Sequence, residues 1–283
     1  MIHEIAPHVL YTDFHTYTAA PDDVALVFRG GDILLRRGDK GGSLPRFADL
    51  PYGEIPAEAE YLFRLDGQRF FLAPPPPVLT EDAYYADANV SLRMLAPSQD
   101  AFAAVTGLQL YRWRDSRRFC GRCAAPMQKG QRERSAVCPY CGLVEYPKIA
   151  PAVIVAITDG KRLLMAKNRR SAYKRYALIA GYCEIGETFE QTVRREIQEE
   201  VGLQVKNIQY YASQPWAFSD SVMVGFFAEL DGDDRIVLQE EELSDARWFP
   251  FAEIPENGSR LSISQELIEA VRRGEHLRYL SRR

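Results

Sequence analysis

The chain has 283 residues, enough for roughly two domains at about 150 residues each. Its hydrophobic share of 46% and charged share of 26% exclude a disordered, collagen-like or coiled-coil chain. The net charge of −4 selects no class of partner, and no apolar run reaches the roughly 18 residues that span a bilayer. Because the first residues do not resemble a signal peptide, we expect a cytoplasmic protein with no membrane partner.

Residues 1–96 are expected to form a β-rich accessory domain. Short apolar runs between Gly and Asp turn residues predict four strands, at Val24–Phe28, Ile33–Leu35, Tyr61–Leu65 and Phe70–Leu72. The run Pro74–Pro77 interrupts the pattern, because proline lacks a backbone donor. The acidic residues and histidines are scattered here, so the region indicates an accessory or dimerisation module and no chemistry.

Residues 97–146 are expected to form a helix that leads into a metal-binding ribbon. Ser98 is a suitable N-cap, and apolar residues recur at helical spacing after it. Residues 112–134 hold eight basic and two acidic residues, a net charge of +6 in an otherwise acidic chain. This basic ribbon would attract a phosphate-bearing ligand such as RNA. Alternatively, its arginines pair with acidic residues of the other domains.

Two C-x-x-C pairs, fourteen residues apart, predict one tetrahedral zinc ion. The four thiolates would come from Cys120, Cys123, Cys138 and Cys141. A redox dithiol needs only one pair, and two disulfides would not persist in a cytosolic chain, so both alternatives are weaker. Four cysteine ligands leave no position for water, so we expect a structural zinc ion, one per chain.

Residues 147–283 begin with strands. The runs Val153–Ile157 and Leu163–Met165, joined by an Asp-Gly turn, predict a hairpin, and Ala177–Ala180 predicts a further strand. A helix is then predicted over about residues 189–201, because Thr188 and Gln191 form a capping box and Gly202 is a suitable C-terminal glycine.

Three glutamates on one arc of this helix predict a divalent metal site. They are Glu196, Glu199 and Glu200. Like charges at this spacing repel one another, and a cation would remove the repulsion. Oxygen ligands favour Mg²⁺ or Mn²⁺. The alternative is a solvated acidic face of the helix.

The same stretch resembles the Nudix box, G-x5-E-x7-R-E-U-x-E-E-x-G-U, where U is a bulky aliphatic residue. All fixed positions are filled, by Gly181, Glu187, Arg195, Glu196, Ile197, Glu199, Glu200, Gly202 and Leu203. The resemblance implies an α/β/α sandwich that binds two or three Mg²⁺ or Mn²⁺ ions, with Arg195 orienting the glutamates. The metal ligands that it implies are Glu196, Glu199, Glu200, Glu242 and the carbonyl of Ala180. The whole chain is therefore expected to be α+β, with the accessory domain, the zinc ribbon and the Nudix sandwich in that order.

The resemblance extends to the NADH pyrophosphatase subfamily, in which a four-cysteine ribbon precedes the Nudix domain and S-Q-P-W-P-F-P-x-S follows the box. Here that motif reads S-Q-P-W-A-F-S-D-S over residues 213–221, so two prolines and their φ constraints are lost. The substrate contacts that it implies are Glu133, Tyr146, Gln214, Pro215, Trp216, Ala217, Phe218, Ser219, Asp220, Ser221 and Ser264. Taken without the family, Trp216 and Phe218 would more often pack in a core.

The resemblance implies a homodimeric enzyme that hydrolyses the pyrophosphate of NADH or NAD⁺ to the nicotinamide mononucleotide and AMP. Glu196 and Glu200 are both candidates for the base. The same chemistry would remove the NAD cap from an RNA 5′ end, and the basic ribbon makes that substrate plausible. One alternative is a Nudix hydrolase of another nucleoside diphosphate derivative, which the altered loop favours. Another is a non-catalytic module that senses nucleotides and binds nucleic acid, in which damaged glutamates would be expected.

Overall fold

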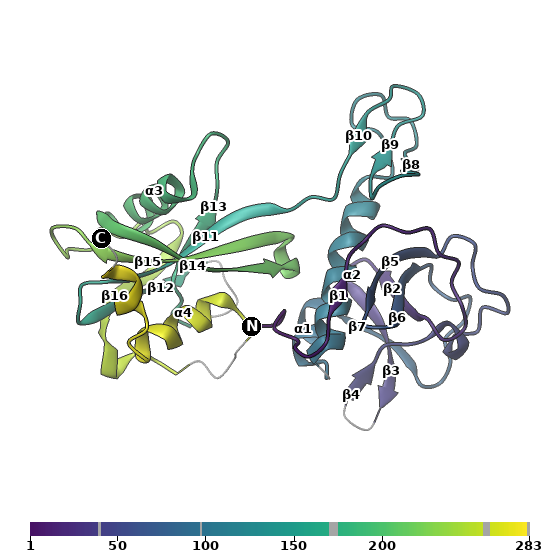
Figure 1. Cartoon of the computed structure of the whole chain (residues 1–283), viewed down its shortest axis with the longest axis horizontal. Helices are drawn as coiled ribbons and strands as arrows, with labels where there is room; N and C mark the ends of the chain where they lie inside the picture. The colour runs from purple at the N-terminus through teal and green to yellow at the C-terminus, as the bar shows by residue number, and fades with distance from the viewer. Residues whose placement is uncertain (39–40, 97, 170–174, 257–260, 282–283) are drawn as a thin grey trace. The chain divides into compact units, whose positions relative to one another are not determined.

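A computed structural model describes residues 1–38, 41–96, 98–169, 175–256 and 261–281. The chain forms two compact units (Figure 1). The N-terminal unit contains Ile2–Lys148 and the short segment Ala217–Asp220, and the C-terminal unit contains Met1, Ile149–Trp216 and Ser221–Arg283. The finer division at residues 96 and 146 stays a prediction. No helix of the described residues is long and apolar enough to cross a membrane.

The N-terminal unit is built on a sheet in the order β1-β5-β6-β2-β3-β4, with β7 paired to β3. The bounds are β1 Leu10–Tyr11, β2 Val24–Arg29, β3 Asp32–Gly38, β4 Gly41–Ser43, η1 Phe47–Asp49, β5 Glu60–Leu65, β6 Gln68–Ala73 and β7 Ala83–Asp87. The four predicted strands are confirmed as β2, β3, β5 and β6. The proline run Pro74–Pro77 lies between β6 and β7, where it ends the pairing.

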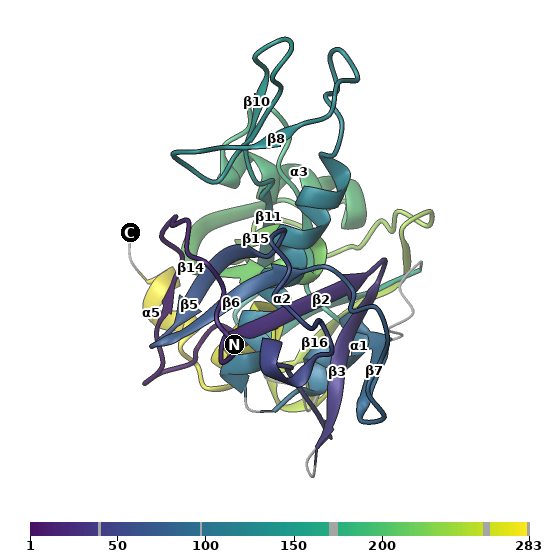
Figure 2. The same ribbon diagram turned by 90° about the vertical axis from the view of Figure 1, so that its right-hand side faces the viewer.

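Two helices follow this sheet, α1 Ala88–Met94 and α2 Ser98–Ser116. Helix α1 was not predicted, because seven residues are too few for a clear helical period. Helix α2 begins with Ser98 itself, one residue earlier than the predicted N-cap implies, and runs beside the sheet (Figure 2). A Cβ on Gly107 would lie 2.2 Å from Cδ1 of Leu26. Glycine therefore allows α2 to approach β2 closely.

The zinc ribbon follows α2 in the same unit. Its three short strands are antiparallel, in the order β10-β9-β8. Their bounds are β8 Gln128–Lys129, β9 Ala136–Val137 and β10 Val144–Glu145.

The C-terminal unit has a mixed sheet in the order β14-β15-β11-β12-β16, with β13 paired to β11. The strands are β11 Ala150–Thr158, β12 Arg162–Asn168, β13 Ile179–Tyr182, β14 Val205–Trp216, β15 Ser221–Leu230 and β16 Leu243–Pro250. The helices are α3 Phe189–Val201, η2 Ala217–Ser219, η3 Phe251–Glu253, α4 Ile263–Arg272 and α5 His276–Leu280, of which η2 belongs to the N-terminal unit. The predicted hairpin is confirmed as β11 and β12.

Alternate residues of β11 face the two sides of this sheet. Val153 and Val155 pack in one core with Ile197 of α3, while Ile154 packs in the other with Leu267 of α4. This alternation follows from the two-residue period of a strand. The sheet therefore lies between two helical layers, which confirms the predicted α/β/α sandwich.

Helix α3 begins and ends where the sequence predicted. The hydroxyl oxygen of Thr188 accepts from the amide of Gln191 at 3.3 Å, and the side chain of Gln191 accepts from the amide of Thr188 at 2.8 Å. Gly202 closes the helix with φ of 68°, a left-handed conformation that favours glycine. The helix is thereby fixed at both ends, with Ile197 and Val201 buried on its inner side.

Candidate active site and zinc site

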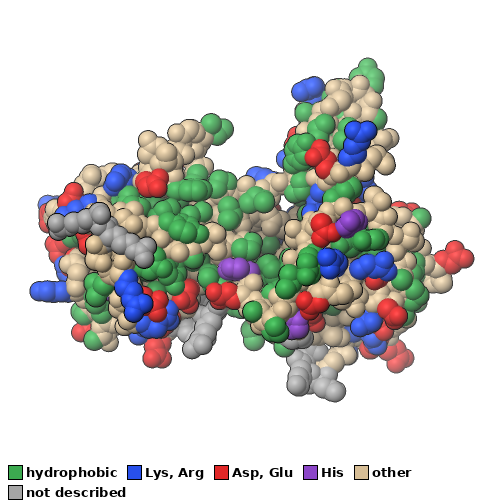
Figure 3. Space-filling view, in the orientation of Figure 1, with side chains coloured by type: hydrophobic (Ala, Val, Ile, Leu, Met, Phe, Trp, Pro, Cys, Tyr) green, Lys and Arg blue, Asp and Glu red, His purple; other side chains and the backbone are tan. Residues whose placement is uncertain are grey.

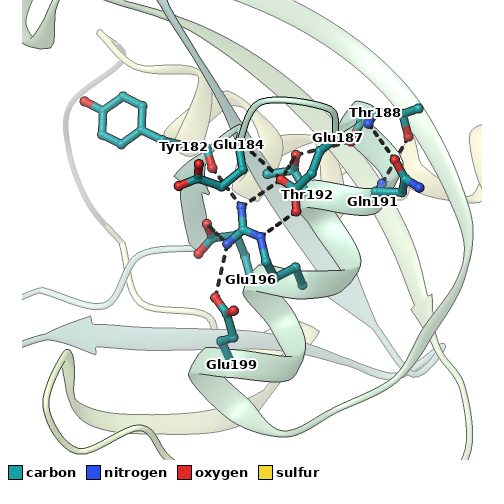
Figure 4. A network of polar contacts seen from close by, with 9 residues as sticks. Tyr182, Glu184, Glu187, Thr188, Gln191, Thr192, Glu196 and Glu199 are labelled. Atoms are coloured by element: carbon teal, nitrogen blue, oxygen red, sulfur yellow. Dashed lines mark hydrogen bonds and ion pairs between the residues drawn. The ribbon is translucent and has the colours of Figure 1, made fainter.

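Arg195 connects the loop before α3 to the helix itself. Its guanidinium donates to both carboxylate oxygens of Glu187, from Nε at 2.6 Å and from Nη2 at 2.9 Å. Nη1 donates to Glu196 at 2.7 Å and to Glu199 at 3.1 Å, and Nη2 also donates to the carbonyl of Tyr182 at 2.9 Å. Figure 4 shows these carboxylates turned toward the same guanidinium. One cation thus orients three of the acidic side chains.

Glu187 is held in its ionised form at the end of the loop. The hydrogen bonds from Arg195 lower its pKa to about 2, and the backbone amide of Glu184 and the hydroxyl of Thr192 contribute in the same direction. This carboxylate is therefore charged at neutral pH. Its hydrogen-bond partners lie in the loop and in α3, which suits a residue that positions the loop.

Glu200 is the most deeply buried of the helix glutamates, with 6% of its surface exposed. Burial, together with the charges of Glu196, Glu242 and Glu199, raises its pKa to about 8. Burial also raises the pKa of Glu196 above its ordinary value, against the opposing effect of Arg195. The carboxylates are thus close enough to disfavour one another's charge. This donor set fits a divalent cation, which would neutralise them.

The carboxylate of Glu196 lies against the backbone of β13. A Cβ on Gly181 would lie 1.9 to 2.2 Å from its carboxyl atoms, so only glycine leaves that space. The neighbouring Ala180, whose carbonyl is a proposed ligand, is exposed and pairs with Ile154 of β11. Glu242 is also exposed, directly before β16. Among the described residues, however, the four cysteines are the only group of three or more such side chains whose ligand atoms all lie within 4.8 Å of one another.

The four predicted zinc ligands converge in the N-terminal unit. Sγ of Cys120 lies 3.6 Å from that of Cys141, and Sγ of Cys123 lies 3.5 Å from that of Cys138. These separations are far beyond a disulfide bond of about 2.0 Å and close to the edge of about 3.8 Å that Zn–S bonds of about 2.3 Å give a tetrahedron. Backbone amides lower the pKa of Cys138, that of Cys141 first. The cluster is a structural zinc-ribbon site.

The loop expected to contact the dinucleotide has side chains of two kinds. Gln214 has no exposed surface: its amide donates to the carbonyl of Leu261 at 2.8 Å and accepts from the amide of Ile263 at 2.7 Å. It therefore holds the start of α4. Ser221 is buried, with its hydroxyl 3.3 Å from that of Tyr182.

The other members of this loop differ in exposure. Pro215 and Ser219 are exposed, Trp216, Phe218 and Asp220 are half-buried, and Ala217 is buried. Trp216 ends β14 in the C-terminal unit, whereas Ala217–Asp220 belongs to the N-terminal unit.

Two further predicted substrate contacts are brought together in the N-terminal unit. The hydroxyl of Tyr146 donates to Glu133 at 2.8 Å, and this bond raises the pKa of the tyrosine. Both side chains are exposed. The remaining one, Ser264, lies in the first turn of α4 in the C-terminal unit.

Arg112 and Arg93 contact the segment Ala217–Asp220, which the sequence did not reveal. Nε of Arg112 donates to Asp220 at 3.0 Å, and Nη2 donates to the carbonyl of Ala217. The guanidinium of Arg93 lies 4.0 Å from the centre of the Phe218 ring, a cation–π geometry. More than 100 residues separate the members of each pair, so no local pattern could join them.

Five of the eight basic residues of the ribbon lie near acids, and three of these five pair with acids outside residues 97–146, as the alternative interpretation predicted. Glu60 accepts from Arg114 at 3.0 Å and lies 3.1 Å from Lys129. The further pairs are Arg112 with Asp220, Arg117 with Glu145 and Arg118 with Asp115. Figure 3 shows Lys and Arg side chains interspersed with Asp and Glu over this unit. The net charge of the segment therefore overstates the charge that it offers to a ligand.

A mixed sheet between two helical layers, with the Nudix-box helix α3 on one face, defines a Nudix domain. Residues 148–270 match the NUDIX domain family, and residues 115–146 match the NADH pyrophosphatase zinc ribbon domain. The NAD-capped RNA hydrolase NudC of Stutzerimonas stutzeri is 38% identical over 245 residues, which are 86% of this chain and 84% of the relative. The protein of that name from Mannheimia succiniciproducens is 44% identical over 176 residues, 58% of this chain and 64% of its own.

A crystal structure of a Nudix hydrolase from Nitrosomonas europaea has a TM-score of 0.49 and 25% identity, over 56% of this chain and 93% of that one. The sequence relatives, with the ribbon and the box, decide the assignment. The chain belongs to the NADH pyrophosphatase family of Nudix hydrolases. The predicted family is thereby confirmed.

Proposed function

We propose that this hydrolase cleaves the pyrophosphate of NADH and NAD⁺, giving the nicotinamide mononucleotide and AMP, and that it also removes NAD caps from RNA. One observation carries the proposal: a complete Nudix box follows a four-cysteine ribbon in a chain that aligns with 84% of an NAD-capped RNA hydrolase. The capped RNA presents the same pyrophosphate as the free dinucleotide. A single site therefore serves both substrates.

The reaction needs a water oxygen to attack phosphorus while the bridging P–O bond breaks, against the repulsion of the phosphate oxygens. Two or three Mg²⁺ or Mn²⁺ ions held by Glu196, Glu199, Glu200, Glu242 and the carbonyl of Ala180 would neutralise the phosphates and lower the pKa of a bound water when present. The raised pKa of Glu200 and the close approach of Glu196 to Gly181 support this ligand set.

The side chains around the proposed ligands have separate tasks. Arg195 fixes the positions of Glu196 and Glu199 through its hydrogen bonds. Proton removal from the attacking water falls to Glu196 or Glu200, the two candidates for the base.

The proposed substrate contacts divide by accessibility. Trp216, Phe218 and Tyr146 offer rings for the planar groups of a dinucleotide, and Arg93 steadies the Phe218 ring. Gln214 and Ser221 are buried, so they act by holding the loop. The motif therefore combines contact residues with positioning residues.

A second candidate function is hydrolysis of another nucleoside diphosphate derivative. It is favoured by Ala217 and Ser219, which stand where the subfamily motif has prolines. A non-catalytic binding module is disfavoured, because all three helix glutamates are intact. We also propose, from the family resemblance, that the enzyme is a cytoplasmic homodimer. Light scattering of the purified protein tests the dimer, and a monomer at assay concentration would refute it.

Product analysis tests the function. Purified enzyme with Mg²⁺ or Mn²⁺ should convert NADH to reduced nicotinamide mononucleotide and AMP in equal amounts, seen by chromatography and mass spectrometry. Trp216→Ala should lower kcat/KM for NADH by about 1 to 3 kcal/mol. A pyrophosphate substrate that lacks the second base should be affected much less.

Equal reductions on the two substrates would make Trp216 a packing residue and leave only generic Nudix activity. Restoring both prolines tests the altered loop: Ala217→Pro with Ser219→Pro should lower KM for NADH if the bound loop has the family's shape. A raised KM would favour another nucleotide substrate.

A further inference from the structure

One face of α2 lines a cavity of about 290 Å³ within the N-terminal unit. Gln109, Arg112, Trp113 and Ser116 lie at positions i, i+3, i+4 and i+7, so they share a side of the helix. Arg117, Lys148 and Asp220 complete the wall. The volume is at the lower end of ligand pockets, which suits a single small group.

The cavity has an excess of positive charge after its internal pairing is counted. Asp220 neutralises Arg112 at 3.0 Å. Lys148 has no acidic partner for its ammonium group among the described residues. Arg117 is only 3.8 Å from Glu145, in a half-exposed and therefore weak pair. Two cations are thus available to an anion that enters.

The wall is also held in place before any ligand arrives. The amide of Gln109 donates to the carbonyl of Lys148 at 3.0 Å, so the backbone at Lys148 is attached to α2. Arg112 attaches the segment Ala217–Asp220 to the same helix through its bonds to Ala217 and Asp220. That segment belongs to the loop assigned to substrate contact. The cavity therefore adjoins the loop along the chain.

We propose that this cavity binds a phosphodiester group of the RNA that follows the NAD cap. The inference rests on the proposed function and extends it beyond the dinucleotide. The positive charges of Lys148 and Arg117 recognise the phosphate, whatever the base. Free NADH has no phosphate beyond its own pyrophosphate, so this site affects only the RNA substrate.

Binding is tested without catalysis, in metal-free enzyme, by fluorescence anisotropy of a labelled 5′-phosphorylated ten-nucleotide RNA. Lys148→Gln with Arg117→Gln should weaken binding about 10-fold and lower the slope of log affinity against log salt by about 0.7 for each phosphate that is no longer neutralised. The matched control, Arg118→Gln with Arg122→Gln, removes the same charge outside the cavity and should change affinity less than about 2-fold. Equal weakening in both double variants would overturn the proposal.

Inorganic phosphate should compete with RNA only weakly. Phosphate that displaces RNA at equal concentration would show a site for the free ion and refute the RNA assignment.

Turnover separates this inference from the function on which it rests. The Lys148 and Arg117 double variant should raise KM for NAD-capped RNA about 10-fold and leave kcat/KM for NADH unchanged. A matching reduction with NADH would assign the cavity to the dinucleotide site and overturn the proposal. If wild-type enzyme hydrolyses neither substrate, the proposed function fails, whereas the anisotropy result still decides whether the cavity binds RNA.

Discussion

Arg195 and Glu187 form a bidentate ion pair across eight residues of chain, with hydrogen bonds of 2.6 and 2.9 Å. Glu187 lies before the first turn of α3 and Arg195 in its second turn, so the pair fastens the loop to the helix. The third guanidinium nitrogen is left for Glu196 and Glu199. The box arginine is thus a positioning residue for two of the proposed metal ligands.

Arg195→Lys should weaken the binding of activating Mg²⁺ or Mn²⁺ by about 10- to 100-fold, as for other residues that orient metal ligands. A single ammonium group cannot make the five hydrogen bonds of this guanidinium. Metal titration of NADH hydrolysis measures the effect. Arg194→Lys is the control, because the Arg194 guanidinium donates to the carbonyl of Val205 and, in the part of the chain that the structure describes, pairs with no glutamate of the site. Equal metal affinity in both variants would contradict the positioning role.

Gly181→Ala should displace the carboxylate of Glu196. The added methyl would lie within about 2 Å of it, and the flexible carboxylate would move before the backbone does. We expect metal affinity to fall about 10-fold or more with little change in the unfolding midpoint. Calorimetric metal titration and thermal unfolding measure the two quantities. Unaltered metal binding would show that Glu196 need not lie at β13.

Glu200→Gln should abolish most turnover, by about 100- to 10,000-fold if Glu200 is the base, and should stabilise the metal-free enzyme. Between the ordinary carboxyl pKa of 4.5 and about 8, folded Glu200 holds a proton that the unfolded chain releases. The free energy of unfolding of the metal-free protein should therefore fall as pH rises through this window. The variant should lack that part of the pH dependence.

Urea unfolding of chelator-treated protein at several pH values between 5 and 8 tests this prediction. Added Mg²⁺ should restore stability to the wild type at pH 8 and do little for Glu200→Gln. If the free energy of unfolding of the wild type rises with pH over this range, ionisation of Glu200 does not destabilise the folded protein, and the prediction is wrong. Near wild-type turnover of the variant at saturating metal would remove it from the catalytic set.

The sequence predicted best those features whose signals are local. The capping box and Gly202 set the ends of α3 within one residue, because the cap contacts join residues three apart. The two C-x-x-C pairs predicted the sulfur cluster, since each pair brings two thiolates together within one turn. The Nudix box likewise specified Arg195 and its acidic partners.

Features that depend on distant segments were not visible in the sequence. The pair of Arg112 and Asp220 spans 108 residues, and the role of Gln214 at the start of α4 depends on residues 47 and 49 positions later. Helix α1 was missed because it is short and follows directly on β7. Burial, which sets the pKa of Glu200, is a property of the assembled sandwich.

Cys138→Ser should destabilise the zinc ribbon before it affects chemistry at the glutamates. Wild-type protein should contain one zinc ion per chain, because four cysteine sulfurs within 4.8 Å of one another, two pairs of them 3.5 and 3.6 Å apart, suit a tetrahedral site. Metal binding free energies of about 10–16 kcal/mol in isolated zinc fingers are also folding free energies, so removing a ligand should cost on the order of several kcal/mol. Elemental analysis and thermal unfolding measure both effects. Cys183→Ser is the matched control, since its thiol lies outside the cluster. Zinc-free wild-type protein with two disulfides by mass spectrometry would refute the site.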